Sequence, residues 1–71
     1  MDPRIELSPT QEWVYRYVRQ YIASEHRPPS LAEISAARGT THHATWEVLK
    51  ALQRKGWIKI TPRIARGIGL T

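Results

Sequence analysis

Two short segments carry the same signal for the start of a helix, and they constrain the fold more than any other feature. Ser8 is followed by Pro9 and, three residues after the serine, by Gln11. Ser30 is likewise followed three residues later by Glu33. In such a capping box the serine hydroxyl and the later side chain each satisfy a backbone amide at the helix start. We therefore predict one helix beginning at Pro9 and a second, short one after Ser30.

The residues after Pro9 repeat with helical spacing. Apolar side chains recur at i, i+3, i+4, i+7 and i+8, which forms one stripe along a helix. The members of the stripe are Val14, Tyr17, Val18, Tyr21 and Ile22. The pair Pro28-Pro29 cannot continue a helix and pushes His26 and Arg27 toward extended backbone. The first helix should therefore end near Glu25.

The second helix should end near Arg38, because Gly39 suits a left-handed C-cap. The residues expected on its inner face are Leu31, Ile34 and Ala37. Only Thr40 and Thr41 separate Gly39 from the next periodic segment, and a threonine hydroxyl can cap the incoming amides. This short junction predicts a helix-turn-helix.

The third helix should span about residues 42–55, because its apolar positions fall within roughly 100° of arc. These positions are Thr45, Val48, Leu49 and Leu52. Gly56 ends this helix, and strand-forming residues follow at 57–61 and again at about 67–70. A hairpin with a basic tip after three helices is the wing of a winged helix domain. The predicted fold is mainly α with a small β-hairpin, a three-helix winged helix-turn-helix.

Composition limits the classes of function. A chain of 71 residues can form one hydrophobic core, so we expect a single domain over residues 1–71 with an ordered core at about residues 7–70. Eleven Lys and Arg against six Asp and Glu give a net charge of +5, which favours a polyanionic partner; a solvated basic surface is the alternative.

Other classes of protein are disfavoured by what the sequence omits. There is no cysteine, and three histidines lie outside any metal-binding spacing, so we expect no metal site and no cofactor. The N-terminal residues have no apolar signal core, and no segment approaches the roughly 20 apolar residues of a membrane span. We expect a cytoplasmic, nucleoid-associated protein without a membrane partner.

The third helix offers the candidate binding residues. In a helix-turn-helix, the N-terminal part of the second helix of the pair contacts base edges in the major groove. His43 can donate or accept there, Glu47 can accept from a cytosine amino group, and Ala44 is small enough to touch a thymine methyl. An ordinary solvated helix surface is the alternative. Trp46 lies at the edge of the apolar arc, so we favour a half-buried core position for it over a base contact.

A second group of residues suits contact with DNA phosphates, which determines position and affinity but not sequence choice. We expect these contacts from Thr41, His42, Lys50, Arg54, Arg63 and Arg66. The third helix and the wing tip each supply two of the basic residues, as expected for a protein that straddles the edge of the groove. A solvated basic face is the alternative for each of them.

Four segments, taken together, resemble a known family. LSPTQEWV, RPPSLAEI, LKALQRKGWIKI and ARGIGL are similar in order and spacing to the N-terminal DNA-binding domain of the LexA repressors, over about residues 7–70. The resemblance implies a winged helix fold, operator DNA as ligand and base contacts from the early third helix. The family's base-contacting positions correspond to His43, Ala44, Trp46 and Glu47.

The chain also departs from the family at several positions. Ala44 and Glu47 keep residues typical of it, whereas His43 replaces an asparagine and Trp46 an acidic residue. The turn after Gly39 is one residue shorter. The repressors' C-terminal domain, with its serine-lysine self-cleavage dyad and dimer interface, has no counterpart here, so we expect no self-cleavage. A fragment of a longer repressor and a free-standing regulator both remain open.

The sequence leaves two functions in competition. The first is sequence-specific binding of double-stranded DNA by a bacterial transcriptional repressor of the SOS-response type that occupies an operator. The second is a protein-interaction module that uses Trp46, Trp57 or Ile64 as an apolar patch. An enzyme with a small-molecule substrate is disfavoured, because the chain has no phosphate loop and is too short for a large cleft. We expect a monomer in isolation, with two copies able to pair on a palindromic operator.

Overall fold

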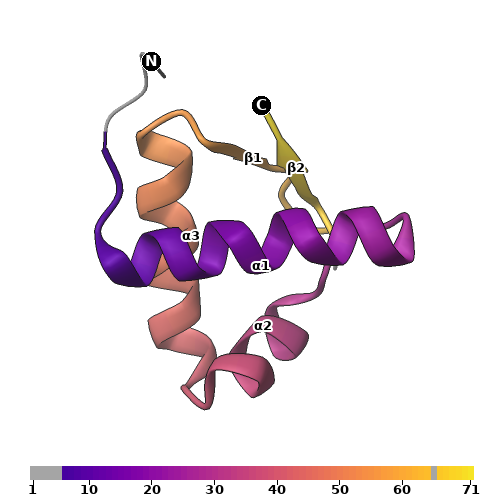
Figure 1. Cartoon of the computed structure of the whole chain (residues 1–71), viewed down its shortest axis with the longest axis horizontal. Coiled ribbons are helices and arrows are strands. Elements are labelled where there is room, and N and C mark those ends of the chain that lie inside the picture. The colour runs from indigo at the N-terminus through magenta and orange to yellow at the C-terminus, as the bar shows by residue number, and fades with distance from the viewer. Residues whose placement is uncertain (1–5, 65) are drawn as a thin grey trace.

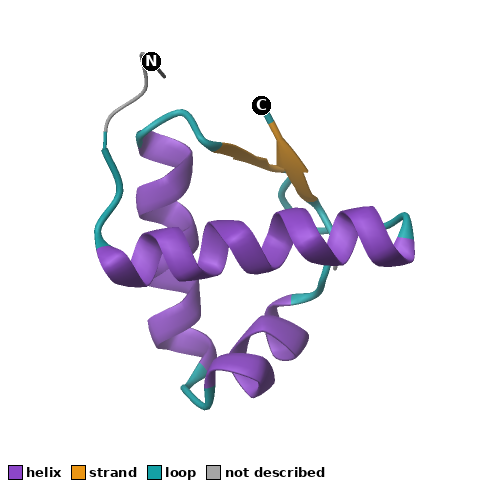
Figure 2. Ribbon diagram, viewed as in Figure 1, coloured by secondary structure: helices purple, strands orange, loops and turns teal. Residues whose placement is uncertain are grey.

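The computed structural model describes residues 6–64 and 66–71, which form three helices followed by an antiparallel hairpin (Figure 1). The helices are α1 (Pro9–Glu25), α2 (Leu31–Arg38) and α3 (His42–Arg54), and the strands are β1 (Ile58–Ile60) and β2 (Ile68–Leu70). Figure 2 shows that short loops join the helices and that the hairpin follows α3 directly. The predicted winged helix-turn-helix is confirmed.

Both predicted capping boxes form. The Gln11 N–H donates to Ser8 Oγ at 3.3 Å, and the Ser8 N–H donates to Gln11 Oε1 at 3.1 Å. In the second box the Glu33 N–H donates to Ser30 Oγ at 3.1 Å, and the Ser30 N–H donates to Glu33 Oε1 at 2.9 Å. Each box satisfies two amides that have no partner within the helix, which explains why α1 and α2 begin where the sequence predicts.

The end of α1 corrects the sequence-based expectation. His26 has left-handed backbone angles, with φ 59 and ψ 27, and its N–H donates to the Ile22 carbonyl at 2.9 Å. We had expected extended backbone at both His26 and Arg27. Pro28 restricts only the residue directly before it, Arg27, so His26 remains able to cap the helix as a left-handed residue.

The core lies where α1 and α2 pack against α3 and where the hairpin closes over α3. Its most buried side chains are 0–2% exposed: Val14, Val18, Ile34, Leu49, Leu52 and Ile58. Thr45, Leu49 and Leu52 are buried as predicted, and Val48 is half-buried. Tyr17, Tyr21 and Ile22 are half-buried, while Tyr15 is 8% exposed and packs edge-to-face on Trp57.

One predicted core position of α2 is wrong. Ala37 is exposed, and Ser35 is buried instead. The face of α2 toward α3 follows the i, i+3, i+4 positions Leu31, Ile34 and Ser35, and a serine can be buried there because its hydroxyl finds partners in both helices.

The hairpin has a short antiparallel register that pairs Ile58 with Leu70 and Ile60 with Ile68. Both strands are shorter than predicted from the sequence. The Thr61 N–H donates to the Gly67 carbonyl at 2.8 Å and closes the loop. A Cβ on Gly67 would lie 2.5 Å from the Thr61 carbonyl oxygen, so this position accepts only glycine without rearrangement. Over the described residues, none of the helices combines the length and hydropathy needed to cross a bilayer.

Candidate nucleic-acid interface

The turn between α2 and α3 is held from inside by hydroxyl groups. The Ser35 hydroxyl contacts Thr45 Oγ1 and the Leu31 carbonyl oxygen, both at 2.8 Å. Thr45 Oγ1 in turn donates to the Thr41 carbonyl at 3.1 Å. Of these contacts the Ser35–Thr45 hydrogen bond joins the two helices, and together with the apolar packing of α2 on α3 it holds the angle between them. Thr45 lies on the inner face as predicted, whereas the burial of Ser35 was not predicted, although its spacing of four residues from Leu31 indicates the same face.

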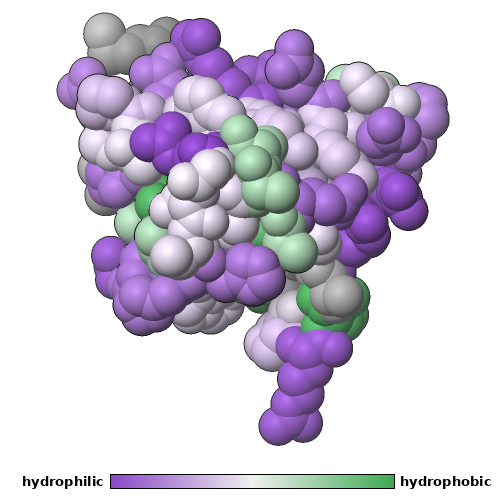
Figure 3. Space-filling view, turned by 90° about the horizontal axis from the view of Figure 1, so that it is seen from below, coloured by the Kyte–Doolittle hydropathy of each residue, from purple (hydrophilic) through white to green (hydrophobic). Residues whose placement is uncertain are grey.

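The start of α3 is capped and exposed. The Ala44 N–H donates to Thr41 Oγ1 at 3.1 Å, so the Thr41 hydroxyl is used by the helix itself. Thr41, His42, His43 and Ala44 are all exposed. Figure 3 shows the molecule from the side of α2 and its turn to α3, where hydrophilic side chains surround separate apolar patches. The predicted contact residues at this end of α3 are therefore accessible to a ligand.

Three charged or ionisable side chains lie in a row along the exposed face of α3. Lys50 Nζ is 3.0 Å from Glu47 Oε1, and His43 Nε2 is 3.9 Å from the same oxygen. The hydrogen bond from Lys50 lowers the pKa of Glu47 below its usual range. Glu47 is therefore a charged hydrogen-bond acceptor at neutral pH, with 53% of its side chain exposed.

Trp46 is next to this row and is 39% exposed. This is more exposure than the favoured half-buried core position implies, and among the described residues Trp46 is not one of the half-buried side chains that pack against the core. Part of the indole ring can therefore contact a ligand. Trp57 is half-buried against Tyr15, and Ile64 is 59% exposed, so these three residues do not share one environment.

The predicted phosphate-contact residues fall into two groups. Arg54 lies exposed in the last turn of α3, and Arg63 lies exposed in the hairpin loop with a left-handed φ of 65. Arg66 differs from both, because its Nη1 is 2.6 Å from Glu33 Oε1 and 2.9 Å from the Pro28 carbonyl. The same nitrogen is 3.4 Å from the Tyr21 hydroxyl.

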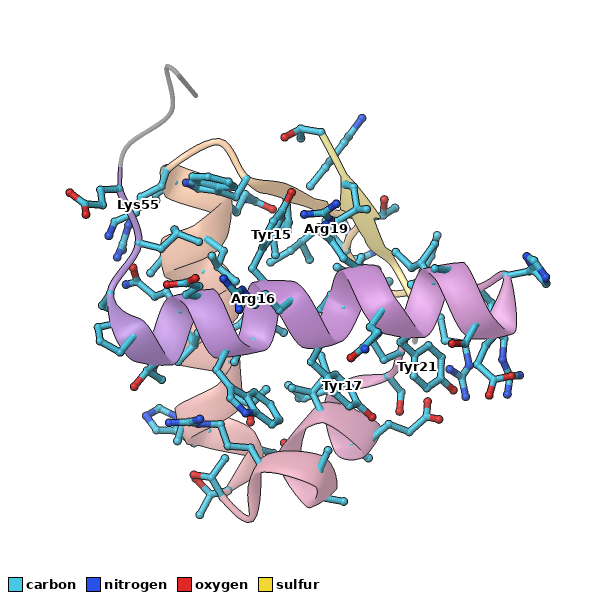
Figure 4. All side chains as sticks on the ribbon, viewed as in Figure 1. Tyr15, Arg16, Tyr17, Arg19, Tyr21 and Lys55 are labelled. Atoms are coloured by element: carbon cyan, nitrogen blue, oxygen red, sulfur yellow. The ribbon has the colours of Figure 1, made fainter. Side chains whose placement is uncertain are left out.

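The groups around Arg66 keep each other charged. The Tyr21 hydroxyl, the Ser30 backbone N–H and Arg66 lower the pKa of Glu33 to about 2. The hydrogen bonds with Tyr21 and Glu33 raise the pKa of Arg66 above its ordinary value. Figure 4 shows Tyr21 and Tyr17 on the side of α1 toward α2, whereas Tyr15 and Arg19 point toward the hairpin. The contact of Glu33 with Ser30 is predictable from the sequence, whereas its contacts with Tyr21 and Arg66 join distant parts of the chain and were not predicted.

Comparison with known proteins agrees with this geometry. The family described as the LexA DNA binding domain matches residues 4–67. The chain is 45% identical over 65 residues to the LexA repressor of Ralstonia pickettii (strain 12J), which covers 90% of this chain and 30% of the relative. The chain is also 45% identical over 65 residues to the LexA repressor of Providencia rettgeri, and this match covers 90% of this chain and 32% of that relative. It is 42% identical over 66 residues to the LexA repressor of Cellvibrio japonicus (strain Ueda107), and this match covers 92% of this chain and 33% of that relative. The chain thus spans about a third of the length of these relatives.

Proposed function

The chain belongs to the family of LexA DNA-binding domains, and from this premise we propose that it binds double-stranded DNA sequence-specifically as a bacterial repressor of the SOS-response type. The observation that carries the proposal is the exposed polar face of α3, which the Ser35–Thr45 contact holds at a fixed angle to α2. A helix presented in this way fits the major groove. The bound repressor would block transcription by occupying its operator.

We propose that the base contacts come from the first half of α3: His43, Ala44, Trp46 and Glu47. Glu47 suits a cytosine, whose exocyclic amino group donates in the major groove. Lys50 and His43 both contact its Oε1, so the second carboxylate oxygen can accept from a base while Lys50 stays paired. The exposed methyl of Ala44 and the exposed part of Trp46 suit thymine methyl groups.

The phosphate contacts are proposed around this face. Thr41 and His42 lie at the start of α3, Lys50 and Arg54 lie along it, and Arg63 lies on the wing. Arg66 is a weaker candidate for a direct contact, because its guanidinium is already bound to Glu33. Without Arg66, three residues of this set are Lys or Arg, and if each neutralises one phosphate the logarithmic salt dependence of affinity should be about −3, since each neutralised phosphate contributes roughly −0.9.

The remaining features of the proposal follow from the family and the fold. The residues of this chain serve binding and position, and we propose no chemistry, cofactor or small-molecule substrate for them. We propose a monomer in isolation that pairs with a second copy on a palindromic operator, as expected for helix-turn-helix proteins with two half-sites. A cytoplasmic location on the nucleoid is part of the same proposal.

Selection of bound sequences from random duplexes tests the proposal. We expect one enriched motif, and its symmetry will show whether two copies bind. Titration of the enriched duplex and of random DNA should then differ by about 10³-fold or more in affinity at one fixed salt concentration. Equal affinity for all duplexes, or salt-insensitive capture of a protein in place of DNA, would contradict the proposal and favour the protein-interaction module.

A further inference from the structure

The Glu33 carboxylate joins three parts of the fold. Its Oε1 accepts from the Ser30 N–H at 2.9 Å at the start of α2 and contacts Arg66 Nη1, from the wing, at 2.6 Å. Its Oε2 accepts from the Tyr21 hydroxyl on α1. Arg66 also donates to the Pro28 carbonyl, 38 residues earlier in the chain. One anion and one cation therefore connect α1, α2 and the wing.

The strands and the loop of the wing are held in place by different contacts. The strands are anchored by Ile58 and Ile68, which are 2% and 8% exposed and lie in the core. The loop between the strands is different, because residues 61–64 are exposed and carry Arg63. Arg66 is the charged residue of this loop that bonds to α1 and α2, and it lies three positions from Arg63.

A direct phosphate contact through Arg66 Nη1 conflicts with these bonds, whereas Nε and Nη2 carry further N–H donors of the same guanidinium. Its Nη1 already has acceptors from Glu33, Pro28 and Tyr21 within 3.4 Å. Turning Nη1 toward DNA would leave the Glu33 carboxylate without its cation, and that carboxylate repels phosphate. Hydrogen bonds to a charged partner are also among the stronger ones, so breaking them opposes binding.

We propose that Arg66 acts in DNA binding as a positioning residue: through Glu33 it fixes the wing against α1 and α2, so that Arg63 meets the DNA backbone while α3 contacts the bases. This inference rests on the proposed function and deepens it, because it assigns Arg66 a different role from that of Arg63, which lies in the same loop of the wing. The two roles predict opposite effects of one substitution.

The decisive variant is Glu33→Gln. Glutamine at this position retains the capping box, as Gln11 does at the start of α1, so α2 should still form. If Glu33 positions the wing through Arg66, affinity for the selected operator should fall about 3- to 30-fold. If Arg66 binds phosphate directly, the substitution frees its guanidinium and removes a repelling charge. Unchanged or tighter binding would therefore overturn the proposal.

A matched control separates this effect from a simple change of net charge. Glu12 forms an ion pair with Arg16 at 2.7 Å on α1, and Glu12→Gln removes the same charge from a pair that does not involve the wing. We expect unchanged or slightly tighter binding for this variant. A loss equal to that of Glu33→Gln would overturn the proposal.

A second measurement works without DNA. In free Glu33→Gln protein we expect faster amide hydrogen exchange at Gly67, whose N–H donates to the Ile64 carbonyl at 3.1 Å, with the α3 amides unchanged. Tyr21→Phe removes one hydrogen bond to Glu33 and should increase the exchange rate at Gly67 by a smaller amount. This variant takes the place of Glu33→Gln if Glu33→Gln does not fold. Unchanged exchange at Gly67 in both variants would overturn the proposal, whereas failure of the wild type to bind any duplex would contradict the proposed function alone.

Discussion

The Ser35 hydroxyl lies 2.8 Å from Thr45 Oγ1, and both side chains are 2% exposed. The Thr45 proton is used by the Thr41 carbonyl, so Thr45 accepts and Ser35 donates in this contact, and the single Ser35 proton is shared with the Leu31 carbonyl oxygen at 2.8 Å. A buried hydroxyl costs free energy unless it is bonded, and here the Ser35 hydroxyl donates to Thr45 while the Thr45 hydroxyl donates to the Thr41 carbonyl. The angle between α2 and α3 therefore depends on a polar pair inside an otherwise apolar core.

Removing either member of this pair should destabilise the domain. We expect Ser35→Ala to cost about 0.5 to 1.5 kcal/mol and Thr45→Val to cost somewhat more, because valine also leaves the Thr41 carbonyl without its hydroxyl donor. In urea unfolding, the double variant should cost less than the sum of the single ones. Strict additivity would mean that the two hydroxyls act independently.

Leu49 tests the predicted inner face of α3. It is 2% exposed, so Leu49→Ala should cost about 2 to 5 kcal/mol of unfolding free energy, enough to unfold a domain of this size. The half-buried Val48 provides the comparison, and Val48→Ala should cost clearly less. A loss below about 0.5 kcal/mol for Leu49→Ala would place this residue at the surface.

Two glycines of the wing should respond differently to the same substitution. Gly67→Ala places a methyl group 2.5 Å from the Thr61 carbonyl oxygen, whereas in Gly69→Ala the nearest atom is the Lys59 carbonyl oxygen at 4.0 Å. We expect the first to cost about 1 to 3 kcal/mol, as overpacking does, and to weaken the protection of the Thr61 amide from hydrogen exchange. Gly69→Ala should be nearly neutral. Equal costs would show that the loop can rearrange around Gly67.

The predicted base contacts can be distinguished from backbone contacts by their selectivity. His43→Ala or Glu47→Ala should cost about 1 to 3 kcal/mol on the selected operator and far less on random DNA, because a base contact needs its matching base. The titrations belong at fixed salt and above pH 7, where an unperturbed histidine is mostly neutral. Arg63→Ala provides the comparison and should weaken both duplexes alike. Equal losses on both duplexes for His43 and Glu47 would make them backbone contacts.

Acid stability should depend on Glu33. The hydrogen bond from Tyr21, followed by those from the Ser30 N–H and Arg66, holds its pKa at about 2, below the ordinary 4.5. The folded state favours the charged form of Glu33. The stability that this carboxylate adds to the fold is therefore fully present above pH 4.5 and is lost as the pH falls through 2. The stability difference between wild type and Glu33→Gln should therefore shrink between these pH values. A difference independent of pH would contradict this assignment.

The sequence predicted the helix starts to the residue, because Ser8 and Ser30 bond within three positions of themselves, and such local chemistry is visible in a linear pattern. The bonds of Arg66 were not predictable in this way. Its contact with the Tyr21 hydroxyl spans 45 residues and depends on how the hairpin turns back onto α1. Position alone made Arg66 equivalent to Arg63, and only the fold distinguishes them. Ser35 is an intermediate case: its spacing of four residues from Leu31 indicates the inner face of α2, but its burial also depends on the hydroxyl that α3 places opposite it.

The two capping boxes have a consequence for the order in which this chain folds. Gln11 Oε1, which accepts from the Ser8 amide, also accepts from Lys55 Nζ at 2.7 Å, and Glu33 is bound by Arg66 in the same way. The groups that start α1 and α2 are therefore completed by cations from the last third of the chain. Isolated helices of 17 and 8 residues are marginal in water. A nascent chain should hold α1 firmly only after Lys55 has emerged and α2 only after the wing has emerged, and the domain should then form in a single cooperative step.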